Sequence, residues 1–305
     1  MPPNMACGAE SLYQLSGKVT PAGEASITVF GATTPFNQST LCDAGGKFTF
    51  RKLQPGTYTI SVFNPEYGEA RRTVEVGPGT AQKDHRVFVS LTFEQSDFTR
   101  APIEKSLSVS TRQLAIPDKA RHQYEESVKE LQRHEVEAAV KNLEQAVEEA
   151  PQFSTAWNQL GTICYQTRKF DRAEECFRKA LDADPKAFEP LVNLGGVLVT
   201  LGRTNESLNY NRYAVLARPN DALANAQLGQ SYFQAGNYDM ALKYLEIARH
   251  LDPAHFSHPQ LVMAEIHLRR GERASAAADL EDFLAHHPDW PTAAQMREMI
   301  SKLKK

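Results

Sequence analysis

The sequence has few cysteines and no long apolar run. Its 305 residues are 41% hydrophobic and 23% charged, which is typical of soluble folded domains. The longest apolar stretches fall far short of the ~20 residues that a transmembrane helix needs. The four cysteines, Cys7, Cys42, Cys164 and Cys176, are too few for a disulfide scaffold in a chain of this length.

The cysteines form two pairs with different expectations. Cys164 and Cys176 fall on successive predicted helices, where we expect two small buried side chains. Cys7 and Cys42 could pair in an oxidising compartment, but the sequence alone does not bring them within bonding distance.

An excess of positive charge is also missing. The formal net charge is −3, and neither half of the chain is strongly basic, so we expect no nucleic-acid or membrane-binding surface. The N-terminus lacks the charged and apolar regions of a signal peptide, and we expect a cytoplasmic protein. Alternatively, Met1 to Glu10 is the end of a signal whose start is missing, and the protein is periplasmic or otherwise extracytoplasmic.

Catalytic motifs are absent as well. There is no Gly-x-Gly-x-x-Gly, phosphate-binding loop or Gly-x-Ser-x-Gly. His122 and Glu125 have the His-x-x-Glu spacing of a zinc-ligand pair, but no third ligand or general base accompanies them. We therefore expect neither an enzyme nor a bound cofactor or metal. The other histidines that gather at helix ends, where they face the negative pole of the helix dipole, are His250, His255, His258, His286 and His287.

A repeat dominates the second part of the chain. Its prolines recur at intervals of 34, 34, 34 and 35 residues: Pro151, Pro185, Pro219, Pro253 and Pro288. A fixed period near 34 is typical of a two-helix unit that must stack on copies of itself. Each proline ends a helix, because it lacks an amide proton and disfavours helical geometry in the residue before it.

Small residues recur in phase with the prolines. Gly161, Gly195 and Gly229 would lie where the two helices of one unit cross, and Ala173, Ser207 and Ala241 would be their small partners. Large residues such as Trp157, Leu160 and Phe177 fill the remaining offsets. These residues resemble the tetratricopeptide repeat. We therefore expect an all-α solenoid over 118–305, with repeats near 120–153, 154–187, 188–221, 222–255 and 257–290 and a capping helix within 291–305.

The first hundred residues have a different pattern. Short runs of alternating polarity lie between turn signals such as Asp43 to Gly46 and Gln54 to Gly56, which predicts an antiparallel β-sandwich. The expected strands are Tyr13 to Thr20, Ala25 to Phe30, Gly46 to Phe50, Gly56 to Phe63, Glu69 to Val76 and Asp84 to Phe93.

The order of these pieces resembles the carboxypeptidase regulatory-like domain, a transthyretin-like sandwich. The residues that carry the resemblance include Gly17-Lys18-Val19, Gly46-Lys47-Phe48 and Leu53-Gln54-Pro55-Gly56. The resemblance implies a domain over 12–93 that is an accessory or adhesion module. The remaining boundaries are a tail over 1–11 and a linker over 94–117.

The resemblance to tetratricopeptide proteins implies that the first helix of each repeat lines a concave groove. Transferring that face onto this sequence gives a mostly uncharged, amide-rich set of candidate peptide-binding residues: Tyr124, Val128, Leu131, Asn158, Thr162, Tyr165, Gln166, Val192, Val199, Gln230, Phe233 and Gln234. Tyr165 and Phe233 would be anchors, and the amides would pair with backbone groups of the ligand. The alternative is that some of these aromatics pack against the adjacent repeat.

Two functions remain open at this point. The first is a non-catalytic adaptor or scaffold that binds a peptide segment or partner helix in the groove. The alternative is a cell-envelope carbohydrate-binding or adhesion protein, in which the sandwich binds and the repeats act as a spacer or assembly module. Self-association through the groove or the C-terminal helix is a further possibility.

Overall fold

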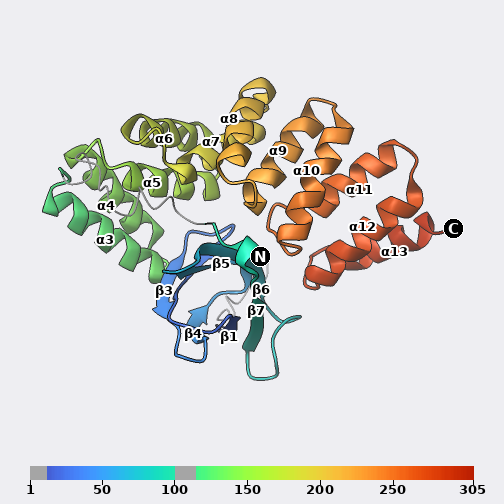
Figure 1. Ribbon diagram of the computed structural model, residues 1–305, viewed down its shortest axis with the longest axis horizontal. Helices are drawn as coiled ribbons and strands as arrows, with labels where there is room; N and C mark the ends of the chain where they lie inside the picture. The colour runs from blue at the N-terminus through green and yellow to red at the C-terminus, as the bar shows by residue number, and fades with distance from the viewer. Residues whose placement is uncertain (1–11, 100–114) are drawn as a thin grey trace, which may run out of the picture.

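The computed structural model describes residues 12–99 and 115–305, which form a β-sandwich and a helical solenoid (Figure 1). The sandwich has seven strands: β1 (Tyr13–Thr20), β2 (Ser26–Gly31), β3 (Asn37–Leu41), β4 (Lys47–Leu53), β5 (Gly56–Asn64), β6 (Gly68–Val76) and β7 (Arg86–Thr92). A short 3-10 turn, Gln95–Asp97, follows them.

The strands form two sheets around one apolar core. One sheet has the order β4-β1-β7, and the other has the order β3-β2-β5-β6. All pairs are antiparallel except β1 with β7, which run parallel. Alternate residues point inward, so that Leu15, Ile27 and Ile60 have no exposed surface. The predicted β-sandwich is therefore confirmed.

Strand β3 was missed in the sequence. Its five residues, Asn37–Leu41, are mostly polar, and only Asn37 is buried. The strand exists because it pairs with β2 from Ser26↔Leu41 to Phe30↔Asn37. An edge strand held by main-chain bonds leaves little apolar periodicity to read.

Eleven helices make up the described part of the solenoid. Their bounds are α3 (Asp118–Gln132), α4 (Val136–Glu149), α5 (Ser154–Gln166), α6 (Phe170–Ala183), α7 (Phe188–Thr200), α8 (Thr204–Ala217), α9 (Ala222–Gln234), α10 (Tyr238–Leu251), α11 (Pro259–Arg269), α12 (Arg273–His286) and α13 (Ala293–Leu303). Helices α3 to α12 form five consecutive pairs, and α13 follows as the last helix.

Glycine permits the close crossing of the two helices within a repeat. A Cβ added to Gly161 would lie 2.6 Å from the Phe177 ring, and one added to Gly229 would lie 2.7 Å from Leu245. Phe177 and Leu245 are almost completely buried there. A larger residue at either glycine would push the helices apart, which explains the 34-residue period of glycine and large apolar side chains.

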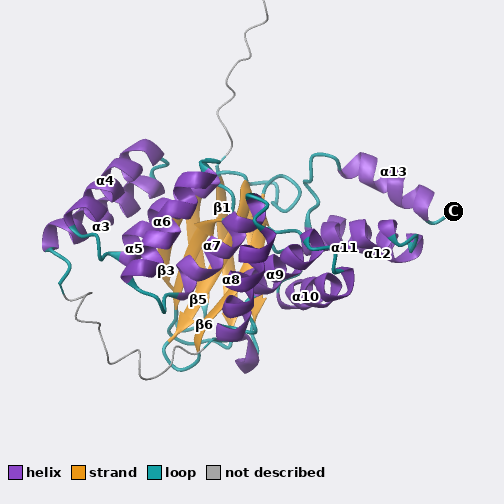
Figure 2. Cartoon of the chain, turned by 90° about the horizontal axis from the view of Figure 1, so that it is seen from above, coloured by secondary structure: helices purple, strands orange, loops and turns teal. Residues whose placement is uncertain are grey.

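The solenoid curves around the sandwich. In Figure 1 the helices form an arc from α3 to α13, and the sandwich lies inside the arc. Figure 2 shows the strands beneath helices α5 to α9. The solenoid therefore has a sandwich on its concave side, and no helix within 12–99 or 115–305 is long and apolar enough to cross a membrane.

The structure also places three of the cysteines. Cys164 and Cys176 are buried between α5 and α6, and both are free. The Cys42 thiol donates a hydrogen bond to the Gly23 carbonyl at 3.0 Å. Cys7 lies outside the described residues, so its pairing with Cys42 stays a prediction.

We expect the substitution Phe177→Ala to destabilise the solenoid by about 3–5 kcal/mol, because it removes a buried ring and leaves a cavity over Gly161. Urea unfolding followed by circular dichroism measures the effect. Tyr213→Ala is the control, since Tyr213 is 65% exposed on α8 and its loss should cost within about 0.5 kcal/mol. Equal effects of the two substitutions would contradict the packing role of Phe177.

Candidate functional site

The candidate groove residues differ widely in exposure. Tyr165 is 38% exposed, whereas Leu131, Val192 and Val199 are buried. Gln234 is exposed as well, and the half-buried members are Tyr124, Val128, Asn158, Thr162, Gln166, Gln230 and Phe233. Accessible candidates therefore concentrate on α5 and α9.

Several candidates contact other parts of the solenoid. The Tyr124 ring lies 5.2 Å from the Phe153 ring, centroid to centroid. Asn158 Oδ1 accepts a hydrogen bond from Asn193 Nδ2 at 3.0 Å. Val192 packs in a small cluster with Phe188 and residues of α8 and α9. In these positions, packing between repeats accounts for much of the buried surface.

A continuous line of side chains occupies the C-terminal ends of four successive first helices. The Tyr165 hydroxyl lies 3.1 Å from Thr200 Oγ1, and Gln234 Nε2 donates to the Val199 carbonyl at 2.9 Å. The Arg269 guanidinium lies 5.0 Å from the centroid of the Phe233 ring. We call this line the strip: Tyr165, Thr200, Phe233, Gln234 and Arg269.

Two members of the strip were missed in the sequence. Thr200 stands 34 residues after Gln166 and 34 before Gln234, so the repeat period alone could have identified it. Arg269 lies 35 residues after Gln234, because the last interval contains one extra residue. The groove positions transferred from the family covered the first four repeats, and Arg269 belongs to the fifth.

The sandwich contacts the solenoid beside the strip, at the residue that follows Tyr165. Gln166 Nε2 donates to the Gly31 carbonyl at the end of β2, at a distance of 2.9 Å. Beside it, the Phe36 ring stacks on the His134 ring with centroids 5.1 Å apart. One groove amide therefore already binds a main-chain carbonyl, which is the kind of contact that the sequence predicted for a ligand.

Strand β6 makes the main contact with the solenoid. Asp252, between α10 and α11, accepts hydrogen bonds from Thr73 Oγ1 at 2.6 Å and from the Thr73 amide at 2.9 Å. Both residues are buried. Burial raises the pKa of Asp252, and the hydrogen bonds from Thr73 oppose that rise.

A charge network lies beside this contact. Arg71 on β6 bonds to Glu69 on the same strand and to Glu189 on α7, each at 2.8 Å. Arg218, after α8, lies 3.3 Å from Glu189. Burial disfavours charge on Glu69 and Arg71, yet the pKa of Glu69 is lowered and that of Arg71 is raised, because the attraction between opposite charges outweighs burial.

The last repeat completes the contact. Glu75 Oε1 lies 2.7 Å from His287 Nδ1, and the Gly79 amide donates to Asp289 at 2.8 Å. We call this whole interface the seam: Arg71, Thr73, Glu75 and Gly79 on the sandwich, with Glu189, Arg218, Asp252, His287 and Asp289 on the solenoid. Nothing in the sequence pattern had indicated it.

Three histidines surround the seam at the last repeat. Burial, together with the neighbouring His287, lowers the pKa of His255 to about 3 and that of His258 to about 4. The His258 ring also lies 4.7 Å from the His287 ring and 5.0 Å from the Trp290 ring. His255 and His258 are therefore neutral in the folded protein at neutral pH. Within the described ranges, no group of three or more His, Cys, Asp or Glu side chains could hold a metal ion.

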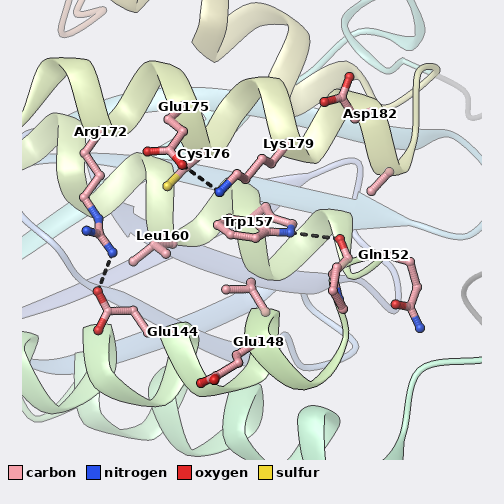
Figure 3. Close-up of a pocket in the computed structure, with 13 residues that line it drawn as sticks. Glu144, Glu148, Gln152, Trp157, Leu160, Arg172, Glu175, Cys176, Lys179 and Asp182 are labelled. Atoms are coloured by element: carbon pink, nitrogen blue, oxygen red, sulfur yellow. Dashed lines mark hydrogen bonds and ion pairs between the residues drawn. The ribbon is translucent and has the colours of Figure 1, made fainter.

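A hollow lies between α4, α5 and α6, away from the seam. It has a volume of about 1030 Å³ and includes Trp157 and Cys176 in its lining. The Lys179 ammonium lies 4.6 Å from the Trp157 ring centroid and pairs with Glu175, while Arg172 pairs with Glu144 (Figure 3). Lys179 and Arg172 are thus both paired with carboxylates that line the same hollow.

The neutral histidines predict a loss of stability in acid. An unfolded histidine titrates near 6.5, whereas His258 titrates near 4 in the folded protein, so the unfolded state binds more protons between these values. We therefore expect stability to fall as pH is lowered from about 6.5 to about 4. Asparagine tolerates the left-handed backbone that His258 adopts at φ 50°. In the His258→Asn variant, the free energy of unfolding should therefore fall by about 1–2 kcal/mol less between pH 7 and pH 5 than in the original protein.

Trp290 fluorescence in a Trp157→Phe background measures this effect during urea unfolding. Only the difference in pH dependence between the two proteins is compared, because buried carboxyls with raised pKa, such as Asp252, act in the opposite direction in both. Identical pH profiles would contradict the assignment.

Family comparisons agree with both parts of the fold. A model of the carboxypeptidase regulatory-like domain matches residues 14–89. Models of the tetratricopeptide repeat match residues 117–188 and 222–255. Each match falls on the part of the chain where the corresponding architecture is seen.

Known proteins resemble the solenoid. The solved structure of MamA, residues 41 to the end, from Desulfovibrio magneticus RS-1 superposes with a TM-score of 0.51 at 22% identity, covering 58% of this chain and 99% of that one. The cell division cycle protein 16 homolog of Homo sapiens is 28% identical over 113 residues, which is 34% of this chain and 18% of that protein. Anaphase-promoting complex subunit 7 of Arabidopsis thaliana is 29% identical over 132 residues, 42% of this chain and 23% of that protein.

These curated relatives are matched over less than a quarter of their own length, so the likeness concerns the repeats. The MamA structure likewise shares the repeat fold alone. Together with the family models, the described architecture shows that the chain consists of a carboxypeptidase regulatory-like β-sandwich followed by an array of tetratricopeptide repeats.

Proposed function

We propose that this protein is a non-catalytic adaptor that binds an extended segment of a partner protein along the strip. The observation that carries the proposal is the alignment of two aromatics, Tyr165 and Phe233, with polar side chains at the ends of the first helices of four successive repeats. The similarity to tetratricopeptide proteins, one of them named as a complex subunit, supports a role in protein interaction.

The polar chemistry of the strip suits a main chain. Gln234 directs its amide group to the Val199 carbonyl, and Gln166, next to the strip member Tyr165, directs its amide group to the Gly31 carbonyl. Thr200 adds a hydroxyl, and Arg269 adds a guanidinium that also bonds to the Tyr238 hydroxyl. An extended segment exposes carbonyls along its length, whereas a helix has bonded them internally, so the strip favours an extended ligand.

The aromatics would provide the anchors. Tyrosine and phenylalanine bury a large area and lose little side-chain freedom, so such residues often dominate binding energy. Tyr165 is braced by the Phe170 ring, and Phe233 is flanked by Tyr238 and Arg269. Both rings are therefore held in place before a partner arrives, which reduces the entropic cost of binding.

The double substitution Tyr165→Ala with Phe233→Ala should weaken binding of the partner at least tenfold, as expected for two anchor residues. The tagged full-length chain is used to capture a partner from native extract, and a peptide from the identified partner is then titrated by calorimetry. Circular dichroism confirms that the variant is folded.

The matched control is Tyr213→Ala with Leu216→Ala. These two side chains are 65% and 77% exposed on α8, so the control removes similar apolar surface from elsewhere on the solenoid. The proposal fails if the strip variant binds the peptide as tightly as the control does.

A further inference from the structure

One junction of the solenoid is polar where the others are apolar. The second helices of the repeats place Leu143, Phe177 and Leu245 at the same offset, but α8 has Asn211 there. The following first helices place Ile163, Val197 and Ile266 at one offset, but α9 has Ser231. Asn211 Nδ2 donates to Ser231 Oγ at 2.9 Å, and both residues are buried.

This polar pair interrupts the apolar core. One cluster of buried side chains runs from Ile116 to Leu198, and a separate one begins at Leu228. Between them lies a small cluster around Phe188 and Val192, and the partly buried Leu208 and Val215 of α8 pack against the cluster that begins at Leu228. Leu143 shares a cluster with Ile163, Phe177 with Val197, and Leu245 with Ile266. The contact of α8 with α9, which we call the polar joint, therefore lacks the apolar pair that holds the other junctions.

The polar joint is also incompletely bonded. Asn211 Oδ1, Asn225 Oδ1 and Gln227 Oε1 are buried and have no hydrogen-bond partner. A buried polar atom without a partner costs free energy that a junction opening to water would recover. Water would supply these three atoms with partners if the junction opened, which offsets part of the cost of opening it.

The seam connects the two sides of the polar joint. Glu189 and Arg218 belong to the repeat before it, and both lie within reach of Arg71 or Glu69 on β6. Asp252 and His287 come after it and bond to Thr73 and Glu75. Because Arg71, Thr73 and Glu75 are alternate residues of one strand, β6 fixes the two halves of the solenoid relative to each other.

We propose that the polar joint is a hinge and that the sandwich is a brace that holds it at one angle. The strip crosses this hinge, with Tyr165 and Thr200 before it and Phe233, Gln234 and Arg269 after it. If the strip binds a partner as proposed above, the brace sets the spacing of the two aromatic anchors. Docking of the sandwich and binding of the partner are then coupled, although Thr73 and Asp252 do not touch the ligand.

Hydrogen exchange measured by mass spectrometry on the full chain tests the hinge without any partner. Thr73→Val removes the hydroxyl bonded to Asp252 and keeps the side-chain shape. We expect roughly tenfold faster exchange at the seam and also in α8 and the N-terminal half of α9, because a lost hydrogen bond to a carboxylate is worth about that factor or more. Thr49→Val, an exposed position of the other sheet, is the control and should change neither region.

A second substitution should suppress the effect. Asn211→Leu restores the residue type found at Leu143 and Leu245, and Leu245 shows that leucine fits over the corresponding glycine. In the double variant with Thr73→Val, we expect fast exchange to persist at the seam while the polar joint returns to the original rate or below. Small-angle scattering should show the larger radius of gyration of Thr73→Val reverting as well.

The inference is overturned if Thr73→Val accelerates the seam but leaves the polar joint unchanged, or if Asn211→Leu does not slow the joint. If Thr73→Val leaves exchange at the seam unchanged, Thr73→Asp is measured instead. It places a second carboxylate against Asp252, so charge repulsion should open the seam. Unchanged exchange in this variant also refutes the brace. The loss or retention of partner binding by the Tyr165 and Phe233 variant has no bearing on these readings, so the two proposals can fail separately.

Discussion

The solenoid depends on a close crossing of two helices, which glycine allows in the three central repeats and the small residues Ser127 and Ala264 allow in the outer two. Gly161 accommodates Phe177, and Gly229 accommodates Leu245, so each repeat buries a large side chain against its own first helix. The paired helices then expose an apolar face that the next repeat covers, which produces the curvature of the array (Figure 1). At Gly195 the same space is filled by Asn211, so the local geometry is preserved while the apolar contact with the next repeat is lost.

The sequence was sufficient to predict what is periodic. The proline interval and the glycine offsets predicted the helix pairs, and alternation predicted six strands, because each signal repeats within a short window. The seam has no such signal. Thr73 and Asp252 are 179 residues apart, and neither departs from the pattern of its own element. Arg269 was missed for a related reason, since its role depends on the ring of Phe233 in another helix.

The concave side of this array is occupied by a folded domain of the same chain. A polar sheet face meets the solenoid through Arg71, Thr73 and Glu75, and these contacts combine buried hydrogen bonds with opposite charges. Such an interface is specific, because removal of one partner leaves a buried charge uncompensated. Gln166 adds a further polar contact between the two parts, since its amide donates to the Gly31 carbonyl of the sandwich.

The pairing of Glu75 with His287 has a consequence for the order of assembly. The two residues are 212 positions apart, so this contact can form only after the chain has been synthesised as far as His287. The sandwich emerges first and has its own apolar core, and the early repeats can stack while later ones are still being made. Arg71 and Thr73 can already contact Glu189 and Asp252 at that stage, so Glu75 is the residue of β6 whose partner arrives last.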